Sequence, residues 1–245
     1  MSKLKFKSLE ELNNKIIGCR KCLRLAKWRE KIAKEKVSRF KNWDYWGKPV
    51  PSFGDKEAEI LIVGLAPAAH GGNRTGRMFT GDRSGEWLYR TLFKFGFANQ
   101  PESTSRDDGL KLNNCYITAI VRCAPPENKP TKKEIENCNI YLKNEIELLK
   151  NVKIIITLGQ LAFSTIVKTL SNFGFEKVNG DKIFRHGNEL TFTNKKSNKT
   201  INLICSYHPS QRNTFTGKLN QRMFDKIFAR AQNLLLDNAN HAYLP

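Results

Sequence analysis

The stretch that decides the fold is Ile60-Leu61-Ile62-Val63-Gly64, which runs directly into LAPAAHGGNRTGRMFTGD, residues 65–82. A short apolar run that stops at a glycine predicts a buried strand of a parallel sheet. We call residues 65–82 the glycine-rich loop. Its glycines allow backbone N–H groups to approach a bound molecule. The sequence therefore predicts a buried strand followed by a pocket lined by backbone.

Three further apolar runs, residues 115–121, 153–158 and 201–205, predict additional strands, and helical patterns separate them. This alternation predicts an α/β fold, a three-layer α/β/α sandwich with a central, mostly parallel four-stranded sheet. No domain boundary is visible, so we expect a single domain over residues 1–245. Binding sites in such folds lie past the carboxyl ends of the strands, where Arg122 and His208 occur.

An N-terminal helix is predicted from Ser8 to about Gly18, with Glu11 at the capping-box position. Helices are also predicted over residues 84–94, from Thr131, up to about Leu170 and over residues 219–236. The basic, aromatic stretch of residues 28–46 is expected to form a long connection.

The chain is strongly basic. Its 245 residues contain 42 Lys and Arg against 23 Asp and Glu, a formal net charge of +19. Excess charge of this size favours a polyanionic partner, and nucleic acid fits better than an anionic membrane because no amphipathic anchor or apolar span is visible. A general surface charge is the alternative. No signal peptide is visible, so we expect a cytoplasmic protein.

The glycine-rich loop does not match a known phosphate-binding signature. No Gly-Lys-Ser/Thr follows, which excludes a P-loop, and GxGxxG is absent, which argues against a dinucleotide-binding enzyme. A plain surface loop is the alternative, but nineteen residues from Gly64 to Asp82 that include His, Asn, two Arg and Asp are unusually rich for one.

Four of the six cysteines form a pattern of ligands. Cys19 and Cys22 make a CxxC, and Cys123 and Cys138 follow about a hundred residues later. In a reducing compartment such a set favours a zinc or iron–sulfur site over disulfides, and the spacing does not choose between the two. Buried small residues are the alternative for Cys123 and Cys138. The remaining two, Cys115 and Cys205, lie in apolar strand segments and are expected in the core.

Residues 64–85, with residues 122–131 and 208–217, resemble the motifs of the family 5 uracil-DNA glycosylases, and the cysteine pattern matches as well. The resemblance covers nearly the whole chain from Cys19 to about Gly217. It implies a uracil-glycosylase sandwich with a [4Fe–4S] cluster held by the four cysteines. It also implies a monofunctional DNA glycosylase that flips out and excises uracil, with hypoxanthine and xanthine as further substrates, and so initiates base excision repair.

Base removal needs a flipped nucleotide and groups that stabilise the separating charges. We expect His208 to donate to the uracil edge and Phe79 to stack on the base. The family departs from other uracil glycosylases at Ala66 and Ala119, where polar residues are usual, so Asp82 and Asn128 are the expected catalytic groups. A helix cap is the alternative role for Asp82, and a turn residue for Asn128.

The remaining site residues form two sets. Substrate-binding positions, mostly backbone and small side chains, are Gly64, Leu65, Ala66, Ala68, Asn73, Phe79, Ala119 and Asn213. DNA-binding positions are Arg74, Arg77, Gln211 and Arg212, with Arg83 as a further phosphate contact.

The expected partner is double- or single-stranded DNA that contains deaminated bases. We expect a monomer without membrane contact and with a sliding clamp as a candidate protein partner. The main alternative function is a non-catalytic nucleic-acid-binding protein stabilised by a four-cysteine metal or iron–sulfur site. It explains the charge and the cysteines but not the pairing of the glycine-rich loop with His208-Pro209-Ser210.

Overall fold

The structure is a computed structural model that describes residues 5–241, with side chains up to residue 237. Seven strands form one sheet in the order β1-β3-β2-β4-β7-β6-β5. In chain order the strands are β1 (Phe53–Gly54), β2 (Ile60–Gly64), β3 (Cys115–Ala119), β4 (Ile154–Leu158), β5 (Glu176–Asn179), β6 (Glu189–Asn194) and β7 (Lys199–Ser206).

The four predicted strands are the parallel centre of this sheet. In register, Ile62 of β2 lies beside Ile117 of β3 on one side and Ile156 of β4 on the other. The sheet is wider than the four strands predicted, because β1 joins one edge and the hairpin β5–β6 joins the other, all antiparallel. The added strands lack a continuous apolar run: β1 has two residues, and β5 is exposed throughout.

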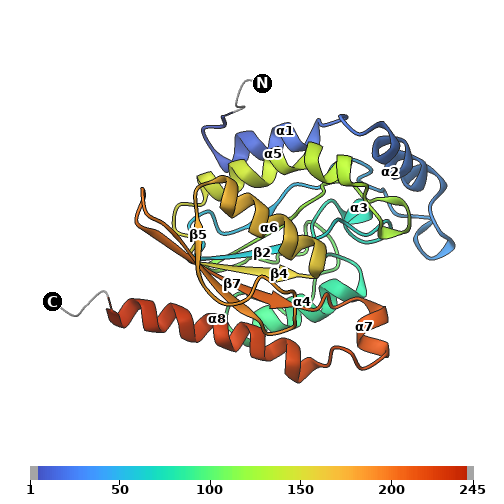
Figure 1. Cartoon of the computed structure of the whole chain (residues 1–245). Coiled ribbons are helices and arrows are strands. Elements are labelled where there is room, and N and C mark those ends of the chain that lie inside the picture. The colour runs from blue at the N-terminus through green and yellow to red at the C-terminus, as the bar shows by residue number, and fades with distance from the viewer. Residues whose placement is uncertain (1–4, 242–245) are drawn as a thin grey trace.

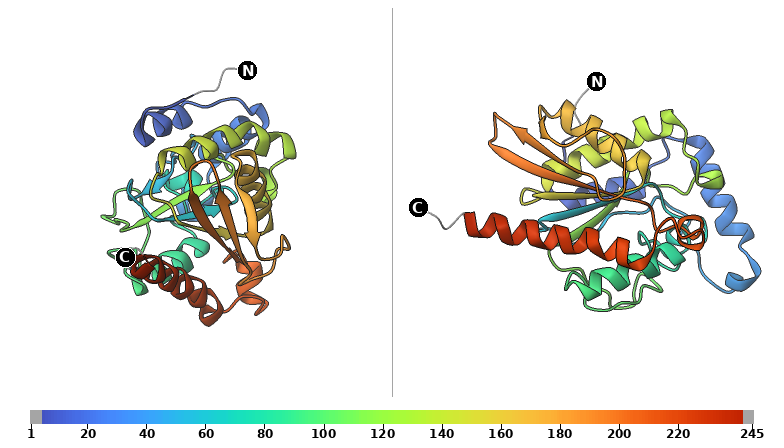
Figure 2. Two further views of the ribbon diagram at one scale, coloured as in Figure 1. Left: turned by 60° about the vertical axis from the view of Figure 1, so that its left-hand side comes forward. Right: turned by 60° about the horizontal axis from the view of Figure 1, so that its bottom comes forward.

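Helices cover both faces of the sheet (Figures 1 and 2). Their bounds are α1 (Leu9–Ile17), α2 (Leu23–Glu35), α3 (Gly72–Thr75), α4 (Arg83–Lys94), α5 (Lys132–Leu148), α6 (Gln160–Asn172), α7 (Gln211–Phe215) and α8 (Gln221–His241), with 3-10 turns η1 (Ser38–Phe40) and η2 (Pro126–Asn128). No helix in residues 5–241 is long and apolar enough to cross a membrane.

Alternating side chains of the central strands build two cores. Leu61 and Val63 of β2 belong to the core under α5 and α6, whereas Ile60 and Ile62 belong to the core under α4 and α8. Successive strand residues point to opposite faces, so a strand covered on both sides must be apolar throughout. This is why these strands are visible in the sequence as continuous apolar runs.

Helix α2 corrects the prediction of a long connection over residues 28–46. Its buried positions are Leu25, Ala26 and Arg29, so one of the three side chains that face the protein is a cation. The sequence therefore lacks an apolar stripe of normal width, so its periodicity does not reveal the helix. Only the part after Glu35, with the short turn η1, is a connection.

A buried ion pair joins the sheet to α5. The guanidinium of Arg122, just past β3, donates to the carboxylate of Glu145 on α5, and both side chains are almost fully buried at 1% and 0% exposure. Ser52 and Thr118 complete the network: the Thr118 hydroxyl donates to Glu145 at 2.7 Å, and the Ser52 hydroxyl donates to the same carboxylate. The network therefore ties the segment before β1, strand β3 and α5 together.

Removing the acid from this network should be costly, because Arg122 would remain buried without a counter-charge. We expect Glu145→Ala to lower the free energy of unfolding by about 3–5 kcal/mol in urea titrations. Glu147→Ala is the control, because Glu147 lies on the same helix and is exposed. Equal, small losses in both variants would contradict the role given to the pair.

Candidate active site

A cleft of about 680 Å³ opens at the carboxyl ends of the parallel strands. Its walls come from the glycine-rich loop after β2, from the η2 turn after β3 and from the segment after β7. The lining residues are Arg39, Leu65, Ala66, Pro67, Ala68, Ala69, His70, Gly71, Met78, Phe79, Gly81, Asp82, Arg83, Ser84, Asn128, His208, Ser210, Gln211 and Arg212. The cleft thus brings together all three residues predicted to be catalytic.

Asp82 begins helix α4. Its carboxylate oxygen Oδ1 accepts a hydrogen bond from the backbone N–H of Gly85 at 3.0 Å, which is the expected contact of a helix N-cap. The same carboxylate lies against Gly71, where a Cβ atom would approach Oδ2 to 2.0 Å. Glycine is required there, because any side chain would displace the acid. Asp82 is therefore both a cap and a cleft residue.

Burial raises the pKa of the Asp82 carboxyl, and the backbone N–H donors of Gly85 and Ser84 offset part of that rise. Burial disfavours the charged form, whereas hydrogen bonds to the carboxylate favour it. A carboxyl with a raised pKa at the wall of a cleft is the kind of group that handles protons in enzymes.

Phe79 and His208 form one aromatic pair in the cleft. Their ring centroids lie 5.9 Å apart with an interplanar angle of 29°, so the two rings are in direct contact. The tip of the Phe79 ring rests on the end of β2, where a Cβ atom at Gly64 would come within 2.7 Å of Cζ. Phe79 holds a positive φ of 53°, a strained conformation of the kind found at binding sites.

The surroundings of the His208 imidazole favour its neutral form. Burial lowers its pKa to about 4, because the imidazolium form loses hydration. Neither ring nitrogen has a hydrogen-bond partner within the described residues, while the backbone carbonyl of His208 accepts from Asn213 Nδ2 at 2.9 Å. The imidazole is therefore free to bind a ligand in the cleft, and Asn213 braces the backbone behind it.

Asn128 projects from the η2 turn in a strained conformation. Glu127 and Asn128 both hold positive φ angles, 53° and 57°. Two consecutive non-glycine residues in this region are unusual, and such strain concentrates at functional sites. The turn thereby brings the exposed Asn128 side chain to the wall of the cleft.

Arg74 and Arg77 correct the phosphate contacts predicted for them, because both are turned inward and are only 3% exposed. The Arg77 guanidinium pairs with the Asp108 carboxylate at 2.7 Å and 2.9 Å. The Arg74 guanidinium donates to two loop carbonyls and lies over the ring of Phe40 at 3.8 Å. These arginines hold the glycine-rich loop in shape.

Four of the predicted substrate contacts are not among the residues that line the cleft: Gly64, Asn73, Ala119 and Asn213. Asn73 is fully buried, and its Nδ2 donates to the backbone carbonyl of Arg29 on α2 at 3.2 Å. Ala119 is buried at the end of β3 and packs in the core. Leu65, Ala66 and Ala68 do line the cleft, as predicted.

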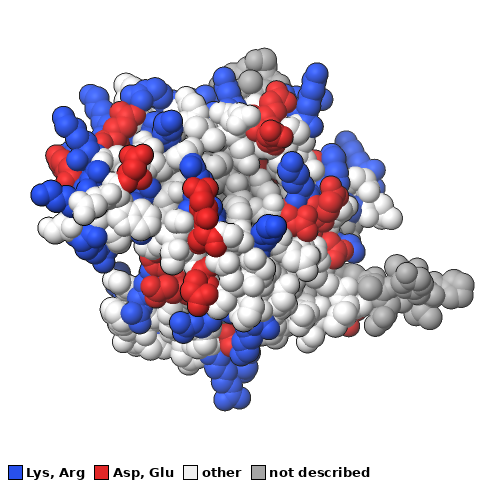
Figure 3. Space-filling view, turned by 180° about the vertical axis from the view of Figure 1, so that it is seen from behind, with Lys and Arg blue, Asp and Glu red and all other residues white. Residues whose placement is uncertain are grey.

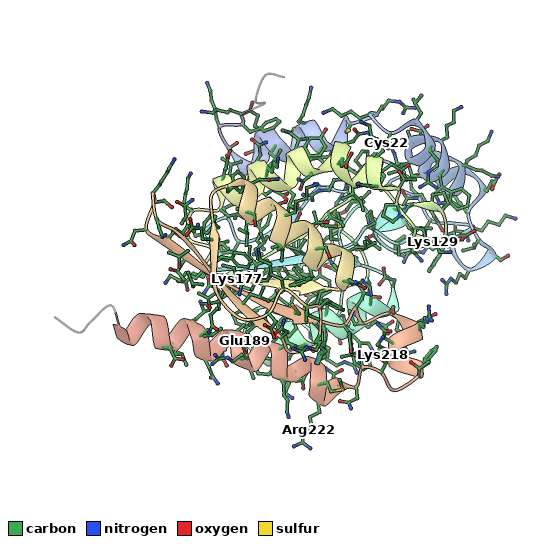
Figure 4. The ribbon with its side chains drawn as sticks, in the orientation of Figure 1. Cys22, Lys129, Lys177, Glu189, Lys218 and Arg222 are labelled. Carbon is green, nitrogen blue, oxygen red and sulfur yellow. The ribbon has the colours of Figure 1, made fainter. Side chains whose placement is uncertain are left out.

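The rim of the cleft carries exposed cations. Gln211 and Arg212 of α7 lie on one side, and Arg83 lies 4.5 Å from the ring centroid of the exposed Phe215. Arg39 lies in the connection after α2, where no sequence pattern marks it as a cleft residue. Lys129 and Lys218 project at this same end of the sheet (Figure 4). Seen from behind, basic side chains also gather over the end of the molecule that carries α2 (Figure 3).

A second, smaller cavity is lined by Cys19, Cys22, Cys123 and Cys138, among other residues; we call it the cysteine cavity. Cys22 lies where α2 meets the end of α5 (Figure 4). Burial raises the pKa of the Cys123 thiol to about 11 and that of Cys138 to about 12. Cys115 and Cys205 are buried in the two sheet cores, as the sequence predicts.

The model of the Uracil DNA glycosylase superfamily matches residues 51–232. The chain is 43% identical to the type-5 uracil-DNA glycosylase of Thermus thermophilus over 89% of this chain and 94% of the relative. It is 45% identical to that of Mycobacterium tuberculosis, over 93% and 82%, and 39% identical to that of Pyrobaculum aerophilum, over 91% of each.

This chain belongs to the type-5 family of the uracil-DNA glycosylase superfamily. The family resemblance predicted from the motifs is thereby confirmed. A type-4 uracil-DNA glycosylase of Sulfurisphaera tokodaii is more distant, at 29% identity over 83% of this chain and 74% of the relative. The matched region contains the glycine-rich loop, the η2 turn and His208, which lie on the three walls of the cleft.

Replacing Asp82 separates its charge from its capping role. Because its folded-state pKa is raised, the ionised carboxyl costs stability as the pH rises through that value, and no cost remains below the pKa of the unfolded chain. Asp82→Asn keeps a good cap, so we expect a Tm above that of the wild type at pH 7 and no difference at strongly acidic pH. Asp82→Ala loses the cap and should be about 1 kcal/mol less stable than Asp82→Asn. Thermal unfolding of all three proteins between acidic and neutral pH checks this, and an Asp82→Asn variant less stable at pH 7 would contradict it.

Proposed function

We infer that this chain is a hydrolytic DNA glycosylase that excises uracil from DNA. The observation that carries the proposal is the convergence of Asp82, Asn128 and His208 in one cleft, in a chain of the type-5 family. Base excision requires a pocket for one extruded nucleotide, and exposed cations at its mouth suit a polyanionic strand.

The cleft can recognise an extruded base by stacking and by directed donors. Phe79 and His208 touch, so a base that packs against Phe79 would lie beside the imidazole. A neutral imidazole can donate one hydrogen bond to the uracil O2 and so stabilise the charge that develops on the leaving base. Leu65, Ala66 and Ala68 add backbone to the same wall.

The chemistry divides between the two ends of the glycosidic bond. The bond between C1′ of deoxyribose and N1 of uracil breaks, and its electron pair leaves with the base. The oxygen of a water molecule bonds to C1′, and one proton of that water passes to a general base of the protein. We assign this proton to Asp82, whose carboxylate also stabilises the cationic sugar, and assign positioning of the water to Asn128.

We propose a pocket that admits deaminated purines as well as uracil. The residue at 66 in the cleft wall is an alanine, and alanine offers no side-chain hydrogen bond that would be left unpaired by a different base. Sites reject analogues strongly when their polar groups lose partners, so a wall without them discriminates weakly.

We propose that the cysteine cavity holds a [4Fe–4S] cluster. Among the described residues, no three His, Cys, Asp or Glu side chains converge closely enough to hold a single metal ion. The four cysteines nonetheless line one small cavity, and cysteine thiolates hold iron–sulfur clusters as well as zinc, so the choice of a cluster rests on the resemblance to the type-5 family. The buried cation Arg29 beside Cys123 adds charge that suits an anionic group. Such a cluster would fasten the N-terminal helices to the loop after β3.

The proposed DNA grip rests on the exposed rim. Gln211 and Arg212 are long enough to fill the space left by the extruded base, and Arg39 and Arg83 are placed to meet phosphates on either side of the cleft. Cytoplasmic location, the monomeric state and a sliding-clamp partner stay predictions.

Base release from duplexes that carry a single uracil, hypoxanthine, xanthine or undamaged base tests the activity. We expect His208→Ala and Asp82→Asn to lower kcat for uracil about 10²–10³-fold, because each removes a group aimed at separating charge. The wild-type rate should fall as the pH drops through the raised pKa of Asp82, since only the carboxylate accepts a proton.

Glu102→Gln is the control for this assay, because it removes an exposed carboxylate that lies outside the cleft. DNA binding without release of any base would support the alternative of a binding protein. Release of uracil alone would overturn the proposed breadth and leave the uracil activity standing.

Replacing one cysteine tests the cofactor. We expect Cys138→Ala to abolish absorbance near about 400 nm and to lower Tm markedly, because the binding energy of such a group is also folding energy. Cys205→Ala, in the core, should keep the absorbance. Bound zinc and a colourless wild-type protein prepared without oxygen would contradict the iron–sulfur assignment.

A further inference from the structure

We propose that Arg29 is a positioning residue that couples the cysteine cavity to the glycine-rich loop. Its guanidinium faces the cavity, and its backbone carbonyl holds the loop through Asn73. The proposal deepens the function inferred above and rests on it, because it connects the iron–sulfur group to the cleft through hydrogen bonds.

The guanidinium of Arg29 is a buried cation directed at the cysteines. The side chain is 3% exposed, and Nη1 donates to Cys123 Sγ at 3.0 Å. The nearest carboxylate, Glu30, lies 3.4 Å away, is 41% exposed and also pairs with Arg20. A buried charge requires a counter-charge, and the thiolates of a bound anionic cluster would supply one.

The backbone around Arg29 continues toward the cleft. Its carbonyl accepts from Asn73 Nδ2 at 3.2 Å, and its Nε donates to the carbonyl of Gly47 at 3.1 Å. The N–H of Gly47 in turn donates to the carbonyl of Asn73 at 3.0 Å. Arg29, Gly47 and Asn73 thus form a closed ring of hydrogen bonds.

Asn73 transmits this ring to the catalytic wall. It lies in α3, inside the glycine-rich loop, and its own N–H donates to the carbonyl of Ala68, a residue that lines the cleft. Gly71, two residues earlier, is the surface on which the Asp82 carboxylate rests. A shift of α3 would therefore move both the backbone wall and the catalytic acid. Displacements of about 1 Å at such a site cost on the order of a hundredfold in rate.

Two variants separate the ends of this route. Arg29→Gln should make the midpoint potential of the cluster more negative, because a nearby cation that favours the reduced form is lost. It should also speed hydrogen exchange in a peptide that spans residues 68–82 and lower kcat on the order of tenfold. Asn73→Ala should reproduce the faster exchange and the lower kcat while it leaves the potential unchanged. Lys27→Gln removes an exposed cation from the same helix and is the control for all three readouts.

The results discriminate clearly. An Asn73→Ala protein with wild-type exchange and kcat would overturn the proposal, and so would an Arg29→Gln protein that shifts the potential without loosening the loop. If Arg29→Gln does not fold, the coupling is tested with Asn73→Ala and Arg29→Lys, because lysine keeps the positive charge beside the cluster. If none of the proteins releases uracil but the hydrogen exchange and potentials change as expected, the proposed activity is wrong and the coupling is supported. A wild-type protein without a cluster would overturn the coupling.

Discussion

The buried pair of Arg122 and Glu145 is the interaction on which the arrangement of the rest depends. Arg122 follows β3, its side chain reaches α5, and its backbone carbonyl accepts from Val50 at 2.7 Å. The residue after it is Cys123, so the same few atoms fix the end of the sheet and one wall of the cysteine cavity. Because both charges are buried, removing either one would leave the other as an unpaired charge in an apolar interior. The pair gives the N-terminal segment, the sheet and α5 one common frame.

The parallel core and the ends of the cleft could be predicted from the sequence for a physical reason. Strands covered on both faces must be apolar at every position, and ligands of parallel sheets bind past the carboxyl ends. Gly64 ends one apolar run and His208 follows another, so both residues could be placed at the carboxyl ends of strands. This is why two walls of the cleft could be predicted. The exposed strand β5 and the two-residue β1 lack such an apolar run, so pattern alone does not reveal them.

The burial of charged side chains could not be read from the sequence. Arg29, Arg74 and Arg77 carry the positive charge typical of DNA-binding residues. Stacking, carbonyl acceptors and the Asp108 carboxylate nevertheless keep them inside the protein. Sequence gives the charge of an arginine and not the direction in which it points. By contrast Arg39, which lines the cleft, lay in a stretch without periodicity. The net charge was a sound guide to the class of partner and a poor guide to the individual contacts.

The sheet order has a consequence for the order in which the chain acquires its activity. One wall of the cleft is complete by residue 85, but His208 follows β7, which must pair with β4 after the whole β5–β6 hairpin has been made. A chain emerging from the ribosome therefore carries the acid of the site long before its imidazole. The core under α4 and α8 also waits for Leu219, Phe224 and Phe228, so both that core and the site are completed by the last part of the chain to be synthesised.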